Sequence, residues 1–256
     1  MKSRFWLFLA ILCGVYLLGW AALLVGAGSY TTPADVWKIL NSREIRYSTL
    51  LSLTTCTVTA VLSVVVAVPM GYFMSRSRFP GHALVDAALD IPIVLPPMVV
   101  GICLLIFFQT AVGRFIESWM AFTYSIAGVV LAQWVISVAF AIRTMRGVFD
   151  HLSARPEKVA LTLGCTPWQA FWYVTLPSAR RGMWAALSIA WARSLGEFGP
   201  ILVFAGATRM KTEVLPTSIW LTWSAGELEQ GVAVSLLMIA VSMVVLVAIR
   251  LAGGRA

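Results

Sequence analysis

The sequence has little charge and lacks the residue patterns that support catalysis. Only 12% of its 256 residues are charged, whereas charged residues make up about 25% of a soluble domain. The four cysteines show no CxxC or Cys/His spacing and the two histidines are isolated, so we expect neither a disulfide nor a metal site. No GxxxxGKS or GxxxxGKT phosphate loop and no Ser/His/Asp constellation occurs. We therefore expect a protein that holds no ATP and no cofactor of its own and is not an enzyme.

The charge balance is basic, but its distribution argues against nucleic-acid binding. The chain has 19 Lys and Arg and 11 Asp and Glu, which gives a net charge of +8. These basic residues are scattered singly and in pairs over short loops, whereas a nucleic-acid-binding protein gathers them on one face. Because hydrophobic residues make up 60% of the chain, we expect the lipid bilayer to surround most of it and no nucleic acid to bind it.

Long apolar runs are abundant and predict an all-α membrane protein with six transmembrane helices. Each run is long enough to cross about 30 Å of hydrocarbon as a helix. The runs cover residues 5–26, 50–74, 89–109, 121–142, 183–206 and 232–251. The first could instead be a signal peptide, but it exceeds the usual apolar core of roughly 7–15 residues, so we expect it to be retained. We expect residues 1–256 to form a single transmembrane domain.

The positions of Lys and Arg predict the orientation of the bundle, because cytoplasmic loops carry an excess of these residues. With the N-terminus inside, twelve basic residues fall on the cytoplasmic side and six on the outer side. The inner set is Lys2, Arg4, Arg76, Arg78, Arg143, Arg146, Arg155, Lys158, Arg180, Arg181, Arg250 and Arg255. The outer set is Lys38, Arg43, Arg46, Arg114, Arg209 and Lys211. We therefore expect a multi-pass protein of the cytoplasmic membrane with both termini in the cytoplasm.

A short helix is predicted in the first outer loop. Thr32 can cap it, Pro33 suits the first helical position, and Asp35 completes a capping box. The apolar side chains that follow form one face of the helix. We expect this helix to lie at the membrane interface.

A polar island at residues 156–177, within a loop of residues 150–181, separates the fourth and fifth apolar runs, and we expect it in the cytoplasm. Its first helix should begin at Pro156 and end at Gly164, because glycine suits a left-handed C-terminal cap. Val159 and Leu163 share one face of this helix. A helix this short is marginal alone. We expect the bundle to cover one face of the island and a partner protein the other, although an ordinary ordered loop is the alternative.

The second helix of the island has a clear start signal. Thr166 is the cap, Pro167 is the first helical residue, and Gln169 can reach back to the backbone of the cap. One aromatic face follows, made of Trp168, Phe171 and Trp172. Together the two helices have the form of an element that passes force from an outside motor into the membrane.

The island resembles the cytoplasmic EAA loop of binding-protein-dependent ABC importer permeases. That loop has Glu-Ala-Ala, a glycine four residues after the last alanine, and Leu-Pro about a dozen residues further on. Here Lys158-Val159 replaces Glu-Ala, and Glu157 lies one position early. The matching residues are Ala160, Gly164, Leu176 and Pro177. The resemblance implies that the loop couples the bundle to a separate ATPase through Glu157, Lys158, Ala160, Gly164, Trp168, Phe171, Leu176 and Pro177.

Two further segments look like those of molybdate-type permeases, within the wider group that carries molybdate, tungstate and sulfate. One covers residues 90–101, and the other covers residues 192–199 with 212–219. The resemblance spans a core of about residues 50–251 and implies the type I ABC importer permease fold. It also implies a homodimer of this chain, cytoplasmic ABC ATPase subunits and an extracytoplasmic oxyanion-binding protein. Molybdate or tungstate is the expected cargo, with sulfate or thiosulfate as the alternative.

Two charges lie inside the fifth apolar run. A charge at mid-bilayer costs about 2.5–3.5 kcal/mol, so we expect Arg193 and Glu197, one helical turn apart, to pair and to point into the bundle. Pro200 lacks an N–H group, and its ring clashes with the carbonyl of Gly196, so the helix should kink or unwind there. The ion pair either stabilises packing or belongs to a gate.

Prolines predict a second break, near Pro92–Pro97 in the third run, which matches the break near Gly196–Pro200 in the fifth. Broken backbone at membrane depth is tolerated where protein or a watery cavity covers it. We expect these two segments to line the translocation path, although the prolines could merely bend the helices for packing. The expected path residues are Pro96, Pro97, Arg193, Glu197, Gly199 and Pro200.

Two other classes of function were weighed against an ABC permease. A stand-alone channel or ion-coupled carrier conflicts with the scarcity of acidic residues for a proton relay in the apolar runs. Neither it nor a membrane scaffold or sensor accounts for the pair of helices in the polar island. The sequence therefore favours a permease that is driven by a separate ATPase.

Overall fold

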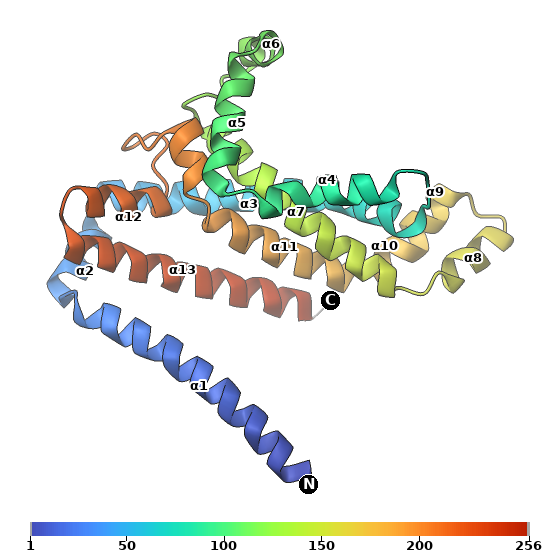
Figure 1. Ribbon diagram of the computed structural model, residues 1–256, viewed down its shortest axis with the longest axis horizontal. Coiled ribbons are helices and arrows are strands. Elements are labelled where there is room, and N and C mark those ends of the chain that lie inside the picture. Colours follow the sequence, from blue (N-terminus) through green and yellow to red (C-terminus); the bar gives the residue numbers. More distant parts are fainter. Residues whose placement is uncertain (1, 255–256) are drawn as a thin grey trace.

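The computed structural model describes residues 2–254, which form an elongated bundle of helices without a strand (Figure 1). This confirms the all-α prediction. The elements are α1 (Lys2–Ser29), α2 (Pro33–Asn41), α3 (Arg43–Arg76), α4 (His82–Val94), α5 (Pro97–Gln109), α6 (Ala111–Trp119), α7 (Ile126–His151), α8 (Arg155–Thr162), α9 (Pro167–Ala170), the π-helix η1 (Phe171–Thr175), α10 (Leu176–Ser178), α11 (Arg180–Leu195), the π-helix η2 (Ile201–Ala205), α12 (Leu215–Ser224) and α13 (Leu228–Gly254).

Within the described residues, the four helices α1, α3, α7 and α13 are long and apolar enough to cross a membrane. The pair α4–α5 is a fifth candidate, but its halves are bent by 106° where the chain passes from one to the other. The fifth predicted run consists of α11 and η2 with irregular backbone between them. The architecture of several apolar helices is confirmed, and the count of six spans stays a prediction.

The centre of the bundle lies where α3 packs against α7 and α11, and we call these three helices the central unit. Small residues let membrane helices approach closely, and α3 buries a row of them: Ser48, Ser52, Thr55, Thr59 and Ser63. Gly71 of α3 is so close to α7 that a Cβ there would lie 2.8 Å from the backbone nitrogen of Arg146. Ser137 of α7 shares a hydrogen bond of 2.9 Å with Ser194 of α11. Close backbone packing thus holds the central unit together.

The periphery of the molecule exposes much apolar surface. The spanning part of α1 is 0% buried, and Figure 1 shows α1 diverging from the bundle while α5 projects sideways and ends in α6. Along α5, Met98, Ile102 and Ile106 stand exposed at intervals of one helical turn. In a membrane, lipid or another chain covers such surface.

The helix predicted in the first outer loop is confirmed as α2. Thr32 and Asp35 form the expected reciprocal capping box, and Pro33 is the first helical residue. The Thr32 hydroxyl and the Thr32 backbone N–H both donate to the Asp35 carboxylate and lower its pKa, because they stabilise its ionised form. Figure 1 places α2 and α12 at one end of the bundle and α8, α9 and α10 at the other.

Candidate functional site

The polar island folds as the hairpin α8–α10, which we define as residues 155–178. Thr166 caps α9 and forms the predicted capping box, in which the backbone nitrogen of Gln169 donates to Thr166 Oγ1 and the backbone nitrogen of Thr166 donates to Gln169 Oε1. Gly164 has a φ of +92°, as the predicted left-handed cap requires. Both local start and stop signals are therefore confirmed.

The backbone after α9 winds wider than the sequence predicts. Residues Phe171–Thr175 form the π-helix η1, which is followed directly by α10. A π-helical turn accommodates an extra residue and commonly occurs at functional sites. Because of this extra residue, the side chains after η1 do not lie on the helical face that an unbroken α-helix would give them.

The three aromatic residues predicted to form one face of the hairpin lie in two different environments. Trp168 and Trp172 pack edge to face with their ring centroids 5.6 Å apart, and both remain exposed. Phe171 adjoins both rings, but it turns towards the bundle and lies 4.7 Å from the ring of Tyr72. Phe171 therefore belongs to the inner side of the hairpin and the two tryptophans to its outer side.

The outer side of the hairpin is an exposed apolar surface. The side chain of Leu163 is 80% exposed, that of Tyr173 is 78% exposed and that of Trp168 is 68% exposed. Large apolar side chains exposed on a short segment that is otherwise polar indicate an interaction site. We call Val159, Leu163, Trp168, Trp172 and Tyr173 the outer patch.

The other predicted coupling residues lie at the edges of the hairpin or beneath it. Lys158 and Pro177 are exposed, whereas Ala160 is 8% exposed and Leu176 packs against the core of the bundle. The hairpin is thus amphipathic, with one side on the bundle and one side free. The bundle therefore covers one side of the hairpin, as predicted, and the partner for the other side stays a prediction.

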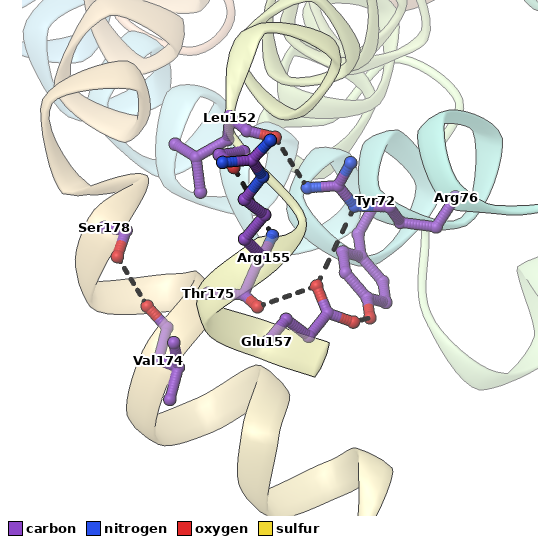
Figure 2. Close-up of polar contacts among 9 residues, drawn as sticks. Tyr72, Arg76, Leu152, Arg155, Glu157, Val174, Thr175 and Ser178 are labelled. Carbon is purple, nitrogen blue, oxygen red and sulfur yellow. Dashed lines mark hydrogen bonds and ion pairs between the residues drawn. The ribbon is translucent and has the colours of Figure 1, made fainter. Parts of the chain in front are cut away.

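Glu157 lies on the inner side, where a polar joint connects the hairpin to the bundle (Figure 2). The hydroxyl of Tyr72 donates a hydrogen bond to Glu157 Oε1. Thr175 Oγ1 donates to Glu157 Oε2 over 3.1 Å, and Arg76 Nε lies 3.8 Å from the same oxygen. The guanidinium of Arg76 also donates to the carbonyl of Leu152 at the end of α7. Residues of α3, α8 and η1 therefore meet at one carboxylate, and Arg76 connects this joint to the end of α7.

Sequence reasoning missed Tyr72, Arg76 and Thr175. Tyr72 and Arg76 are separated by one turn of α3, and Thr175 lies just before the Leu-Pro of the hairpin. The spacing of Tyr72 and Arg76 places them on one helix face, but no local signal pairs them with a residue about 80 positions later. Only the packing of the hairpin on α3 brings them to Glu157.

The two predicted breaks lie against each other, the first at the exposed residues Pro96 and Pro97 and the second at the buried residues Gly199 and Pro200. The backbone is irregular between Val94 and Pro97 and again between α11 and Gly199. A Cβ on Gly199 would lie 2.8 Å from Met98 Cγ, and a Cβ on Gly101 would lie 2.8 Å from Pro200 Cα. Two glycines therefore let the start of α5 lie directly against the start of η2. This places four of the predicted path residues near each other: Pro96, Pro97, Gly199 and Pro200.

Arg193 and Glu197 form the expected ion pair, with Arg193 Nη2 and Glu197 Oε1 2.8 Å apart. The side chain of Glu197 is 1% exposed, so it lies within the bundle, whereas that of Arg193 is 31% exposed. The guanidinium also lies 5.3 Å from the centroid of the Phe140 ring, in cation–π range. Pairing of this kind offsets part of the cost of a buried carboxylate.

The described residues contain no group of three or more His, Cys, Asp and Glu side chains that could hold a metal ion. The arrangement offers no reactive centre, but it combines a hairpin with a free outer patch and a pair of touching helix breaks.

Comparison with known proteins gives the class. The model of the family described as "Binding-protein-dependent transport system inner membrane component" matches residues 67–254. The chain belongs to this family of transporter membrane components. Its multi-pass location in an inner membrane and its role as a permease component, rather than as the ATP-hydrolysing subunit, are therefore confirmed.

Individual relatives match most of the chain. It is 33% identical over 247 residues to the molybdenum transport system permease protein ModB of Mycobacterium bovis, covering 95% of this chain and 92% of that protein. It is 30% identical over 247 residues to the sulfate transport system permease protein CysT of Escherichia coli, covering 94% and 88%. The molybdate/tungstate transport system permease protein WtpB of Thermococcus kodakarensis is 32% identical over 208 residues, covering 80% of each chain.

Solved structures confirm the fold. The crystal structure of a bacterial ABC transporter involved in the import of the polysaccharide alginate contains a chain that matches with a TM-score of 0.76 and 15% identity. The match covers 99% of this chain and 96% of that one. A second structure of an alginate ABC transporter, in complex with its alginate-bound periplasmic protein, matches with a TM-score of 0.74. The chain therefore has the fold of ABC importer permeases.

Proposed function

We propose that this chain is the transmembrane subunit of an ATP-driven importer that carries an oxyanion, molybdate or tungstate, across the cytoplasmic membrane. The relatives named for molybdate and tungstate transport support this choice of cargo. Sulfate or thiosulfate is the second candidate, because the sulfate permease CysT matches over 94% of the chain. The observation that supports coupling to a separate ATPase is the outer patch of the hairpin, which is apolar and exposed.

The proposed assembly contains two copies of this chain, two cytoplasmic ATPase subunits and an extracytoplasmic binding protein. The exposed apolar sides of α1 and α5 support a second copy, which would cover them. The surplus of basic residues beside the hairpin supports a cytoplasmic location for residues 150–181 and for both termini. Closure of the ATPases on ATP would push the hairpin and turn the bundle outward, and ATP hydrolysis would reset it.

The coupling residues in this proposal serve two different purposes. Trp168 and Lys158 lie on or beside the outer patch, where an ATPase would dock, together with the edge residues Gly164 and Pro177. Ala160, Phe171 and Leu176 lie beneath, where they seat the hairpin on the bundle. In this proposal, the movement of the ATPase reaches the membrane helices only if the ATPase binds the hairpin and the hairpin packs firmly on the bundle.

The proposed translocation path passes the two touching breaks. Pro96, Pro97, Gly199 and Pro200 interrupt the helices there, and Arg193 and Glu197 lie just before the second break. Irregular backbone leaves polar groups that a passing anion can contact briefly. Tight binding is left to the separate binding protein, so the path needs no cluster of arginines.

Uptake into vesicles tests the function. The chain is reconstituted with its ATPase and binding protein, and uptake of molybdate, tungstate and sulfate is measured with and without ATP inside the vesicles. We expect ATP-dependent uptake of molybdate or tungstate in preference to sulfate. A preference for sulfate would favour the second candidate. Uptake by the chain alone without ATP would instead identify a channel or carrier, and no uptake of any oxyanion would contradict the proposal.

Replacing Trp168 tests the docking role of the outer patch. Trp168→Ala removes a large exposed ring, and central aromatic residues of interfaces commonly dominate affinity. We expect binding of the ATPase subunit to weaken by about 10- to 30-fold, measured by titration in detergent. Trp223→Ala is the matched control, because Trp223 of α12 is 63% exposed at the other end of the bundle (Figure 1). Equal affinity in both variants would exclude the outer patch as the docking surface.

A further inference from the structure

The carboxylate of Glu157 has all its partners on the bundle side of the hairpin. Tyr72 and Arg76 of α3 approach it from one element and Thr175 of η1 from another (Figure 2). Its side chain is only 16% exposed, whereas the next residue, Lys158, is exposed. A carboxylate that binds a partner protein must present oxygen atoms to that partner. Both oxygens of Glu157 are already used within the chain.

Packing holds Tyr72 in place. Its ring centroid lies 4.7 Å from that of Phe171 in the hairpin and 5.6 Å from that of Phe149 in α7. Phe149 is fully buried in the central unit. Because close-packed rings leave little room for rotation, the Tyr72 hydroxyl keeps a defined position. The same ring therefore touches both the hairpin and the central unit.

Arg76 extends the joint to the end of α7. Its guanidinium donates over 2.9 Å to the carbonyl of Leu152, which caps α7, while its Nε faces Glu157. Cationic side chains commonly satisfy the last carbonyls of a helix in this way. A displacement of Glu157 therefore acts on the ends of α3 and α7 together, and these helices pack with α11 in the central unit.

On the basis of the proposed function, we infer that Glu157 is a positioning residue that anchors α8 to α3. Through this anchor, a push on the outer patch moves the central unit instead of moving the hairpin alone. Hydrogen bonds to an ionised acceptor are short and strong, and a partly buried setting strengthens them further. Glu157 thus acts through Tyr72, Arg76 and Thr175, and the ATPase binds to other residues of the hairpin.

The first test uses the purified chain without partners, so it does not depend on the proposed function. Tyr72→Phe and Glu157→Gln each weaken the joint while keeping the size of the side chain. We expect amide hydrogen exchange in α8 to rise by about three- to tenfold in both variants, because the anchored helix opens more often. The control is Tyr173→Phe, since Tyr173 is on the same hairpin but is 78% exposed. Unchanged exchange in both joint variants would overturn the inference.

The second test uses the complete transporter and separates coupling from docking. For Tyr72→Phe, Thr175→Val and Glu157→Gln, the ATPase subunit should still co-purify, and the uptake per ATP hydrolysed should fall by about three- to tenfold. A purely structural defect would lower uptake and ATP hydrolysis together and leave their ratio unchanged. The double variant Tyr72→Phe with Glu157→Gln should lose no more uptake per ATP than the more affected single variant, because both changes break the same contact.

Two outcomes contradict the anchor. If Glu157→Gln abolishes ATPase binding while Tyr72→Phe has no effect, the carboxylate contacts the ATPase directly. If all three variants keep the wild-type ratio of uptake to ATP hydrolysis, the joint does not transmit movement. A wild-type chain that binds no ATPase would contradict the proposed function instead, and the exchange experiment would still decide whether Glu157 anchors α8.

Discussion

At the scale of single residues, two glycines decide how closely the broken segments pack. Gly101 lies against Pro200 and Gly199 lies against Met98, at distances that leave no room for a Cβ atom. The prolines leave backbone groups without helical hydrogen-bond partners, and the close packing of the two segments buries the second break at Gly199 and Pro200. The glycines therefore matter for the space they leave empty, since neither has a positive φ.

Adding one methyl group at this contact should be costly. In Gly101→Ala, the new Cβ would lie 2.8 Å from Pro200 Cα and 3.2 Å from the Pro200 carbonyl oxygen. Overpacking of this kind costs about 1–3 kcal/mol, so we expect a lower thermal midpoint in detergent, measured by fluorescence of the purified chain. Gly147→Ala in α7 is the control, because nothing lies within 4 Å of its Cβ. A thermal midpoint equal to that of the control would contradict this prediction and show that η2 shifts to make room for the methyl group.

At the scale of elements, α4 is held differently from the other inner helices. None of its residues is fully buried. Two ion pairs connect it to α7, Asp86 with Arg146 and Asp90 with Arg143. A cavity of about 290 Å³ lies between the helices beside these charges. An element fixed by charges at a partly exposed seam can separate more easily than one fixed by a buried apolar face.

Exchanging one charge pair should show whether these contacts hold α4. Arg143→Asp places a third carboxylate beside Asp86 and Asp90, so we expect hydrogen exchange in α4 to rise several-fold. The exchanged double variant Asp90→Arg with Arg143→Asp should return towards the wild-type rate. Raising the salt concentration should reduce the difference between the single variant and wild type. If the double variant exchanges as fast as the single one, apolar packing rather than charge holds α4.

At the scale of the whole molecule, the hairpin and the exposed apolar helices occupy different places. The hairpin with its outer patch occupies one end of the bundle, and α2 with α12 occupies the other (Figure 1). Between them, α1 and α5 expose apolar side chains along their length. This distribution fits a protein that meets a water-soluble partner at one end and lipid or a second copy on its flanks.

Labelling of Cys165 should determine which end faces the cytoplasm. Cys165 is exposed in the turn of the hairpin, and the variants Cys13→Ser, Cys56→Ser and Cys103→Ser leave it as the sole thiol. A membrane-impermeant thiol reagent should label it in inverted vesicles and not in intact spheroplasts. Glu227→Cys, made with Cys165→Ser, is the matched control, since Glu227 is exposed in the turn between α12 and α13. It should show the opposite pattern, and the reverse result for Cys165 would place the hairpin outside.

The sequence by itself determined the features that depend on neighbours within one helical turn. These are the capping boxes at Thr32 and Thr166, the left-handed turn at Gly164, the ion pair of Arg193 and Glu197, and the break before Pro200. Each follows from hydrogen bonds or steric clashes between residues at most about four positions apart, so a short stretch of sequence contains all the interacting groups. The apolar runs likewise identify membrane helices without any knowledge of their packing.

Only the tertiary structure decided how these pieces meet. The bend of 106° between α4 and α5, the wide turn of η1 and the inward position of Phe171 depend on what each segment packs against. The same holds for Glu157, whose partners Tyr72 and Arg76 come from a helix about 80 residues earlier. Such pairings are set by the shapes of whole helices pressed together, because side-chain volume and backbone approach select one arrangement among many that local signals allow.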